Sequence, residues 1–92
     1  MEISPAETEI AGRWVWSGGG IAADAAAERI RALIESHLRM LGRSGDGWST
    51  LYEDPTDGRL WELTYPESHL HGGGPPNLSL VTRAAAEASY TF

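Results

Sequence analysis

Residues 48–65 read Trp48-Ser49-Thr50-Leu51-Tyr52-Glu53-Asp54-Pro55-Thr56-Asp57-Gly58-Arg59-Leu60-Trp61-Glu62-Leu63-Thr64-Tyr65, and much of the architecture follows from this run. Aromatic and β-branched residues dominate its two ends, which predicts strands over 48–52 and 59–65. A turn lies between them, because Pro55 fixes φ at the first corner and Gly58 can adopt positive φ. The run therefore predicts an antiparallel hairpin. On its second strand, alternate residues share a face: Trp61, Leu63 and Tyr65 on one side, and Leu60, Glu62 and Thr64 on the other.

A long helix is expected before this hairpin. Asp24 is a favourable N-cap, because its carboxylate can accept hydrogen bonds from the free N–H groups of the first turn. Arg39 and Arg43 suit the negative end of the helix dipole, and Gly42 stands where a left-handed C-cap is expected. Apolar positions recur every three or four residues between these ends and form one stripe: Ala26, Ile30, Leu33, Ile34, His37, Leu38 and Leu41.

The remaining elements complete a small α+β domain. Further strands are predicted over 13–17 and 78–81, and a short helix over 84–88 with Thr82 as its cap. Residues 1–10 contain few apolar anchors, so we expect a loosely ordered N-terminal segment. The order β-α-β-β-β-short α predicts an antiparallel sheet of about four strands with one long helix packed on a face.

Length and composition exclude several classes of protein. The 92 residues fit one domain, 1–92, and 41% of them are hydrophobic, as in globular proteins. No cysteine is present, which excludes a disulfide scaffold and any cysteine-ligated metal site. No apolar run approaches the length of a membrane helix, and the acidic N-terminus lacks the order of a signal peptide. We therefore expect a cytoplasmic protein.

The charge is negative and unevenly distributed. Thirteen acidic residues against seven arginines give a net charge of −6, and lysine is absent. This balance argues against binding to nucleic acid or to an anionic membrane surface. Residues 44–70 contain six acidic residues and only Arg59 as a base, so this stretch has a net charge of −5. One part of the molecule should carry most of the negative potential.

Candidates for catalysis or metal binding are sparse. His69 and His71 are two residues apart and could share a metal ion, with Glu67, Asp46 or His37 as further ligands, but no complete ligand set is evident. Common nucleophile, phosphate-loop and zinc-protease motifs are absent, and we expect no cofactor.

Two carboxylates and a glycine run were considered as further sites. Glu53 and Glu62 could form an acid–base pair, although carboxylates on a hairpin are usually solvated. The glycines Gly72, Gly73 and Gly74 could bind an anion through their amides or form a recognition loop. No lysine or helix follows them as in a phosphate loop.

The four tryptophans are compatible with two kinds of interface. Trp14 and Trp16 alternate on one predicted strand, and Trp48 and Trp61 belong to the hairpin. A small sheet buries only some of these side chains in its core. Any tryptophan on an outer face would suit an interface with a partner protein or with a second copy of the chain.

The run from Gly47 to Ser68 contains the turn motif at 54–58 and Trp61-Glu62-Leu63-Thr64-Tyr65-Pro66, and His71-Gly72-Gly73-Gly74-Pro75-Pro76 follows it. Gly12-Arg13-Trp14 and the helix residues Asp24, Arg29, Ile30 and Leu33 come before it. Together these motifs resemble those of immunity protein family twenty-seven of bacterial polymorphic toxin systems. The similarity spans nearly the whole chain, from about Glu7 to the last strand. It implies a non-enzymatic protein that binds and neutralises a cognate toxin by occlusion.

The acidic composition indicates a basic, nuclease-like toxin domain as the partner. We expect its contacts among the acidic residues of the hairpin region, with two aromatic anchors and the glycine loop as a second surface: Glu53, Asp54, Asp57, Glu62, Glu67, Trp61, Tyr52, Gly72, Gly73 and Gly74. Two alternatives stay open. One is a small metal-dependent enzyme that uses His69 and His71, and the other is a self-associating structural domain.

Overall fold

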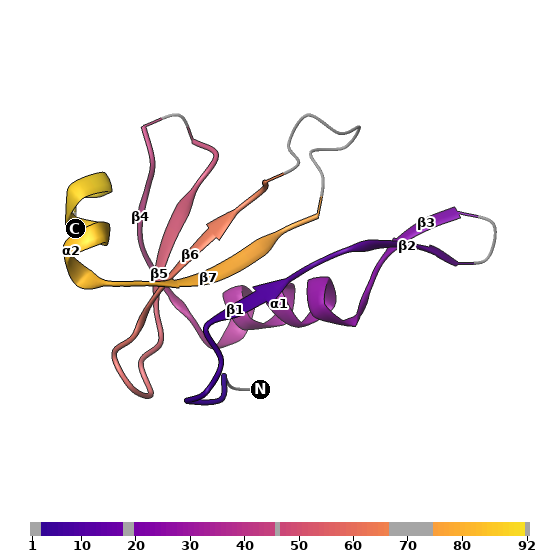
Figure 1. Ribbon diagram of the computed structural model, residues 1–92, viewed down its shortest axis with the longest axis horizontal. Helices are drawn as coiled ribbons and strands as arrows, with labels where there is room; N and C mark the ends of the chain where they lie inside the picture. Colours follow the sequence, from indigo (N-terminus) through magenta and orange to yellow (C-terminus); the bar gives the residue numbers. More distant parts are fainter. Residues whose placement is uncertain (1–2, 18–19, 46, 67–74, 92) are drawn as a thin grey trace.

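A five-stranded antiparallel sheet forms the body of the protein (Figure 1). The computed structural model describes residues 3–17, 20–45, 47–66 and 75–91, and of 14–17 and 20–23 it describes the main chain alone. The strands lie side by side in an order that differs from their order in the sequence: β1 (Glu9–Ala11), β7 (Asn77–Val81), β6 (Leu60–Thr64), β5 (Thr50–Glu53) and β4 (Arg39–Arg43).

Two helices pack against opposite faces of this sheet. Helix α1 (Ala25–Ser36) begins at Asp24, whose carboxylate accepts a hydrogen bond from the Ala27 N–H at 2.8 Å. Helix α2 (Arg83–Ser89) begins at Thr82, whose hydroxyl accepts from the Ala85 N–H at 3.1 Å. Both caps satisfy N–H groups that the first helical turn leaves without partners, as the sequence predicted.

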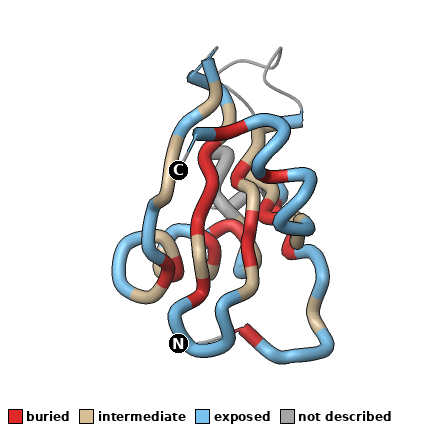
Figure 2. Tube along the Cα trace, turned by 90° about the vertical axis from the view of Figure 1, so that its left-hand side faces the viewer, coloured by how far each residue is buried: buried red, intermediate tan, exposed pale blue. Residues whose placement is uncertain are grey.

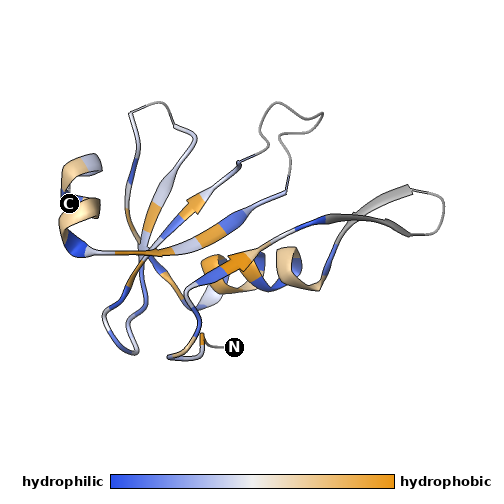
Figure 3. Ribbon diagram, viewed as in Figure 1, coloured by the Kyte–Doolittle hydropathy of each residue, from blue (hydrophilic) through white to orange (hydrophobic). Residues whose placement is uncertain are grey.

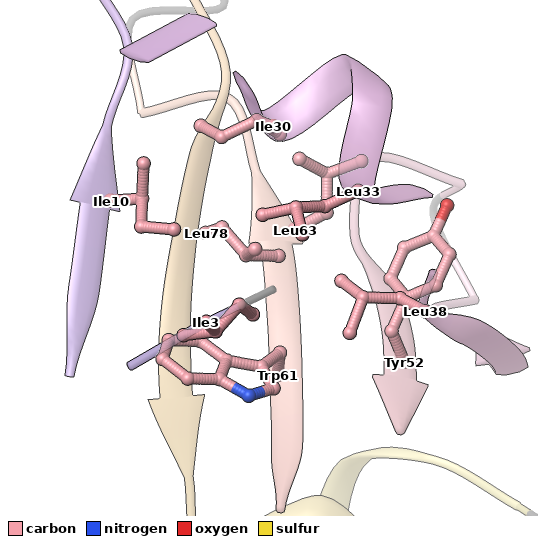
Figure 4. Packing of buried hydrophobic residues seen from close by; sticks show 9 residues of the cluster. All are labelled: Ile3, Ile10, Ile30, Leu33, Leu38, Tyr52, Trp61, Leu63 and Leu78. Carbon is pink, nitrogen blue, oxygen red and sulfur yellow. The ribbon is translucent and has the colours of Figure 1, made fainter. Parts of the chain in front are cut away.

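The main core lies between α1 and the sheet (Figure 4). Leu63 of β6 lies by Ile30 and Leu33 of the helix, whereas Trp61, on the same face of the strand, lies beside Ile3 of the N-terminal segment. Trp61, Ile30 and Leu33 are fully buried. Red, buried segments run along the strands in the middle of the molecule in Figure 2. The whole cluster comprises Ile3, Ile10, Ile30, Leu33, Leu38, Tyr52, Trp61, Leu63 and Leu78.

A smaller core lies on the other face, under α2. Leu51 of β5 and Leu60 of β6 pack there against Ala86 and Tyr90. Leu60 and Trp61 point to opposite faces because side chains alternate along a strand. The same alternation is visible as hydrophobic and hydrophilic segments along β6 and β7 (Figure 3).

The hairpin and its turn form as the sequence predicted. Tyr52 pairs with Trp61 across the antiparallel strands. The Asp54 N–H donates to the Arg59 carbonyl oxygen at 2.9 Å, and Gly58 has a φ of 78°, which favours glycine. The α+β class is therefore confirmed, although the sheet has five strands rather than four and a second helix covers its other face.

The predicted long helix is shorter than expected. It ends at Ser36, and residues 39–43 form strand β4 instead of the last helical turn. Leu38 packs in the core under α1, whereas Leu41 packs on the α2 side. One apolar stripe of a helix cannot contact both faces of a sheet. In addition, β4 hydrogen-bonds to the main-chain groups of β5, which would lack these partners if the helix continued.

Residues 3–10 of the N-terminal segment, for which the sequence predicted loose order, contact the body of the protein. Ile3 and Ile10 are each 5% exposed, and residues 9–11 form β1 beside β7. Arg59 donates to the carbonyl oxygens of Ser4 at 3.1 Å and Glu7 at 3.0 Å. The apolar anchors are few, but a distant arginine supplies the additional contacts.

The strand predicted at 13–17 lies outside the main sheet. It forms β2 (Trp14–Ser17), which pairs with β3 (Gly20–Ala23) in a hairpin that extends away from the body (Figure 1). Gly12 precedes it and donates its N–H to the Pro76 carbonyl oxygen at 2.9 Å. A Cβ at position 12 would lie 2.7 Å from that oxygen, so the close approach requires glycine.

Candidate interaction surface

The sheet face opposite α1 carries a row of polar side chains. Ser79 of β7 pairs with Glu9 of β1 on one side and with Glu62 of β6 on the other. Because Glu62 alternates with the core residues Trp61 and Leu63, its row lies on the α2 side of the sheet. Helix α2 packs over Leu51 and Leu60, at one end of this face. We call residues Glu9, Glu62, Thr64, Asn77 and Ser79 the polar sheet face.

Two carboxylates of the polar sheet face have no arginine partner in the described part of the chain. Glu62 accepts a hydrogen bond from the Tyr90 hydroxyl at 2.7 Å, which fixes its side chain beside α2. Glu9 accepts a long hydrogen bond of 3.4 Å from the Asn77 amide. Both hydrogen-bond donors are uncharged, so neither hydrogen bond pairs the carboxylate with a positive charge.

The other acidic residues of the hairpin are already paired. Glu53 forms an ion pair with Arg39 on the neighbouring strand β4. Asp57 accepts from the Arg59 main-chain N–H at 3.0 Å and pairs with its side chain at 2.6 Å. The main-chain hydrogen bond, assisted by the guanidinium, lowers the pKa of Asp57. A partner protein would have to compete with these arginines for either carboxylate.

Asp54 holds the turn together inside the protein. Its residue is 1% exposed, and its carboxylate accepts from the Thr56 N–H at 2.8 Å. The same oxygen lies 3.0 Å from Nε2 of His37, the residue that ends α1. This geometry argues against the predicted role of Asp54 as a surface contact, because the carboxylate is occupied and covered.

The two predicted aromatic anchors lie in the core. Trp61 is 0% exposed and Tyr52 is 8% exposed, and burial raises the pKa of Tyr52. The Arg59 guanidinium carbon stands 5.2 Å from the centre of the Trp61 ring, within cation–π range. Neither ring is available to a partner in this conformation. The exposed large hydrophobic side chains of the described residues are instead Met40 and Trp48.

The glycine loop and several other candidates lie outside the described residues. These are Asp46, Glu67, His69, His71, Gly72, Gly73 and Gly74. Among the residues that are described, no group of three or more histidine, aspartate or glutamate side chains is placed to hold a metal ion. None of the described helices has the length and apolar character needed to span a membrane.

Glu9 and Met40 are the surface residues that the sequence reasoning missed. Glu9 enters the polar sheet face only because β1 pairs with β7, which lies almost seventy residues away in sequence. The alternation around Ile10 was the available signal, since it places Glu9 and Ala11 on the face opposite the core. Met40 was assigned to a helix, where its exposure on an edge strand could not be foreseen.

The sequence matches the family model for immunity protein 27 over residues 16–82. No curated protein and no solved structure shows significant similarity to the chain. The matched range includes α1, β4, β5, β6 and β7, and hence the hairpin and most of the polar sheet face. It covers well over half of the 92 residues. The chain therefore belongs to the immunity protein 27 family.

Proposed function

We propose that this protein binds a cognate bacterial toxin and neutralises it by occlusion, without catalysing a reaction. Membership of an immunity protein family is the main support for this role. The role requires a surface that recognises the toxin.

The polar sheet face is the surface that fits this role best. The observation that carries the assignment is the pair of carboxylates, Glu9 and Glu62, which flank Ser79 and lack an arginine partner among the described residues. Burying an uncompensated carboxylate is costly unless the partner supplies a cation. A toxin that covers this face should therefore present Arg or Lys side chains.

The expected partner is a basic, nuclease-like toxin domain. Such an enzyme needs positive charge to bind the phosphates of its substrate. The net charge of −6 accelerates its encounter with the immunity protein, and Glu9 and Glu62 would occupy the cations that hold the nucleic acid. Inhibition then follows from blocked access, and no covalent step is required.

Co-expression with the product of the adjacent gene tests this function. The expected result is a stable complex in pull-down and recovery of growth in cells that express the neighbouring protein. Absence of both, with a neighbour shown to be folded and toxic, would contradict the proposed role. A complex that forms without recovery of growth would contradict neutralisation while leaving binding in place.

A further inference from the structure

In the described part of the chain, strand β4 leaves one edge of the five-stranded sheet open. It is the terminal strand, paired only with β5. The Ser44 N–H donates to the Ser49 carbonyl oxygen at 2.9 Å, so it points toward the β5 side of the hairpin. Main-chain groups point alternately to the two sides of a strand in an antiparallel ladder. The N–H and C=O of the adjacent Arg43 therefore point away from β5, toward the open edge. These groups can pair with an added strand.

The two exposed large hydrophobic side chains of the described residues belong to this hairpin, one on β4 and the other in the connection beyond the Arg43–Thr50 pair. Met40 on β4 is 57% exposed, and Trp48, in the connection from β4 to β5, is 56% exposed. Both residue types are enriched in the centres of protein interfaces. All other large hydrophobic residues with described side chains are buried or half-buried. The position of these two side chains therefore marks the β4–β5 hairpin as a contact region.

The charges of β4 argue against a second copy as the occupant. If two β4 strands paired antiparallel over their full length, Arg39 of one copy would face Arg43 of the other, at both ends of the strand. Like charges directly opposite each other destabilise a strand pair. An occupant with an acidic side chain avoids this repulsion.

We propose that the open edge of β4, with Met40 and Trp48, binds an extended apolar segment of the toxin that carries an acidic side chain. The inference rests on the proposed function, since it names where and how the toxin is held. The added strand would pair with the edge at Arg43, while its side chains cover Met40 and Trp48. This is β-strand addition, in which main-chain hydrogen bonds give affinity and side chains give specificity.

Binding of the purified neighbour-encoded protein to Met40→Asp and Trp48→Asp tests the inference. We expect each substitution to weaken the dissociation constant at least about tenfold, as for hot-spot residues. The control is Ala25→Asp, which adds the same charge at an exposed position at the start of α1, on the opposite side of the sheet from the polar sheet face, and should leave affinity unchanged. Both test residues are exposed, so the melting temperature should stay near that of the wild type. In the complex, hydrogen exchange at the Arg43 amide should slow.

Each outcome decides between the proposals. Wild-type affinity in both variants, together with unchanged exchange at Arg43, would refute the edge site while the toxin-binding function stands. No binding by the wild-type protein would remove the edge site and the proposed function together. Concentration-dependent dimers that Met40→Asp dissolves would assign the edge to a second copy of the chain and overturn the toxin segment as its occupant.

Discussion

The two faces of the five-stranded sheet differ in what covers them. The face under α1 is filled by nine mutually packed hydrophobic residues, whereas the opposite face is apolar only where α2 covers it. Beyond α2, the second face carries Glu9, Glu62 and neutral polar residues. Most of the buried core therefore lies on one face, and the other combines a smaller core with the polar sheet face. Substitutions of buried and of exposed residues test this division.

The largest effect should come from the core tryptophan. Trp61→Ala removes a fully buried side chain from the face under α1. Loss of buried area and the resulting cavity should lower the free energy of unfolding by about 3–5 kcal/mol, measured by urea denaturation. For a domain of this size, that is a large part of the total stability.

Trp48→Ala is the matched control, because the same side chain is removed from a position that is 56% exposed. Its cost should stay within about 1 kcal/mol. Equal losses at the two positions would mean that the tryptophans do not divide between core and surface as described.

Two aspartates of one turn should behave differently in the same experiment. Asp54→Ala leaves the Thr56 N–H and His37 without their buried acceptor, which should cost about 1–3 kcal/mol of unfolding free energy. Asp57→Ala removes an exposed ion pair with Arg59, which solvent screens, and should destabilise the protein less than Asp54→Ala. A larger loss at Asp57 would show that the turn depends on its outer pair instead of Asp54.

Acid should weaken the attachment of the N-terminal segment. Arg29 donates two hydrogen bonds to Glu7, of 2.6 and 2.7 Å, which lower the pKa of Glu7 from 4.5 to about 2. A carboxylate with a lowered folded pKa stabilises the protein above its unfolded pKa. This contribution is lost as the pH falls from about 4.5 toward 2.

Glu7→Gln should remove that part of the acid dependence, and at neutral pH it should cost no more than about 1 kcal/mol because the pair is partly exposed to solvent. Denaturation of both proteins between pH 2 and pH 7 compares the curves. Parallel pH profiles would show that Glu7 does not anchor the segment through its charge.

The elements predicted correctly depend on neighbours in sequence. The turn at 54–58 follows from Pro55 and Gly58, and the starts of both helices follow from Asp24 and Thr82, which bond to amides three residues away. Strand β4 was misassigned because residues 38–43 also fit a helical period. Their actual state depends on pairing with β5, which local spacing does not encode.

The candidate surface was only partly predictable for the same reason. The acidic character of the hairpin is evident from the sequence. Tertiary contacts, however, decide which of its acidic side chains are buried, which are paired with an arginine and which are not. Asp54 is covered by the end of α1, Glu53 meets Arg39 of β4, and Glu62 remains without an arginine. Trp48 and Trp61 are the same residue type on one hairpin, but Trp61 is buried because it lies on the core face of β6, where Ile3 of the N-terminal segment lies beside it.

The most direct test of the account is the affinity of the neighbour-encoded toxin for three forms of this protein at several salt concentrations. The Glu9→Gln/Glu62→Gln variant should bind about tenfold or more weakly and lose part of the salt dependence, with unchanged stability. Glu28→Gln/Glu35→Gln makes the same change in net charge at exposed positions of α1 and should bind like the wild type. Equal affinities for all three forms, or a loss confined to the α1 variant, would contradict the assignment of toxin binding to the polar sheet face.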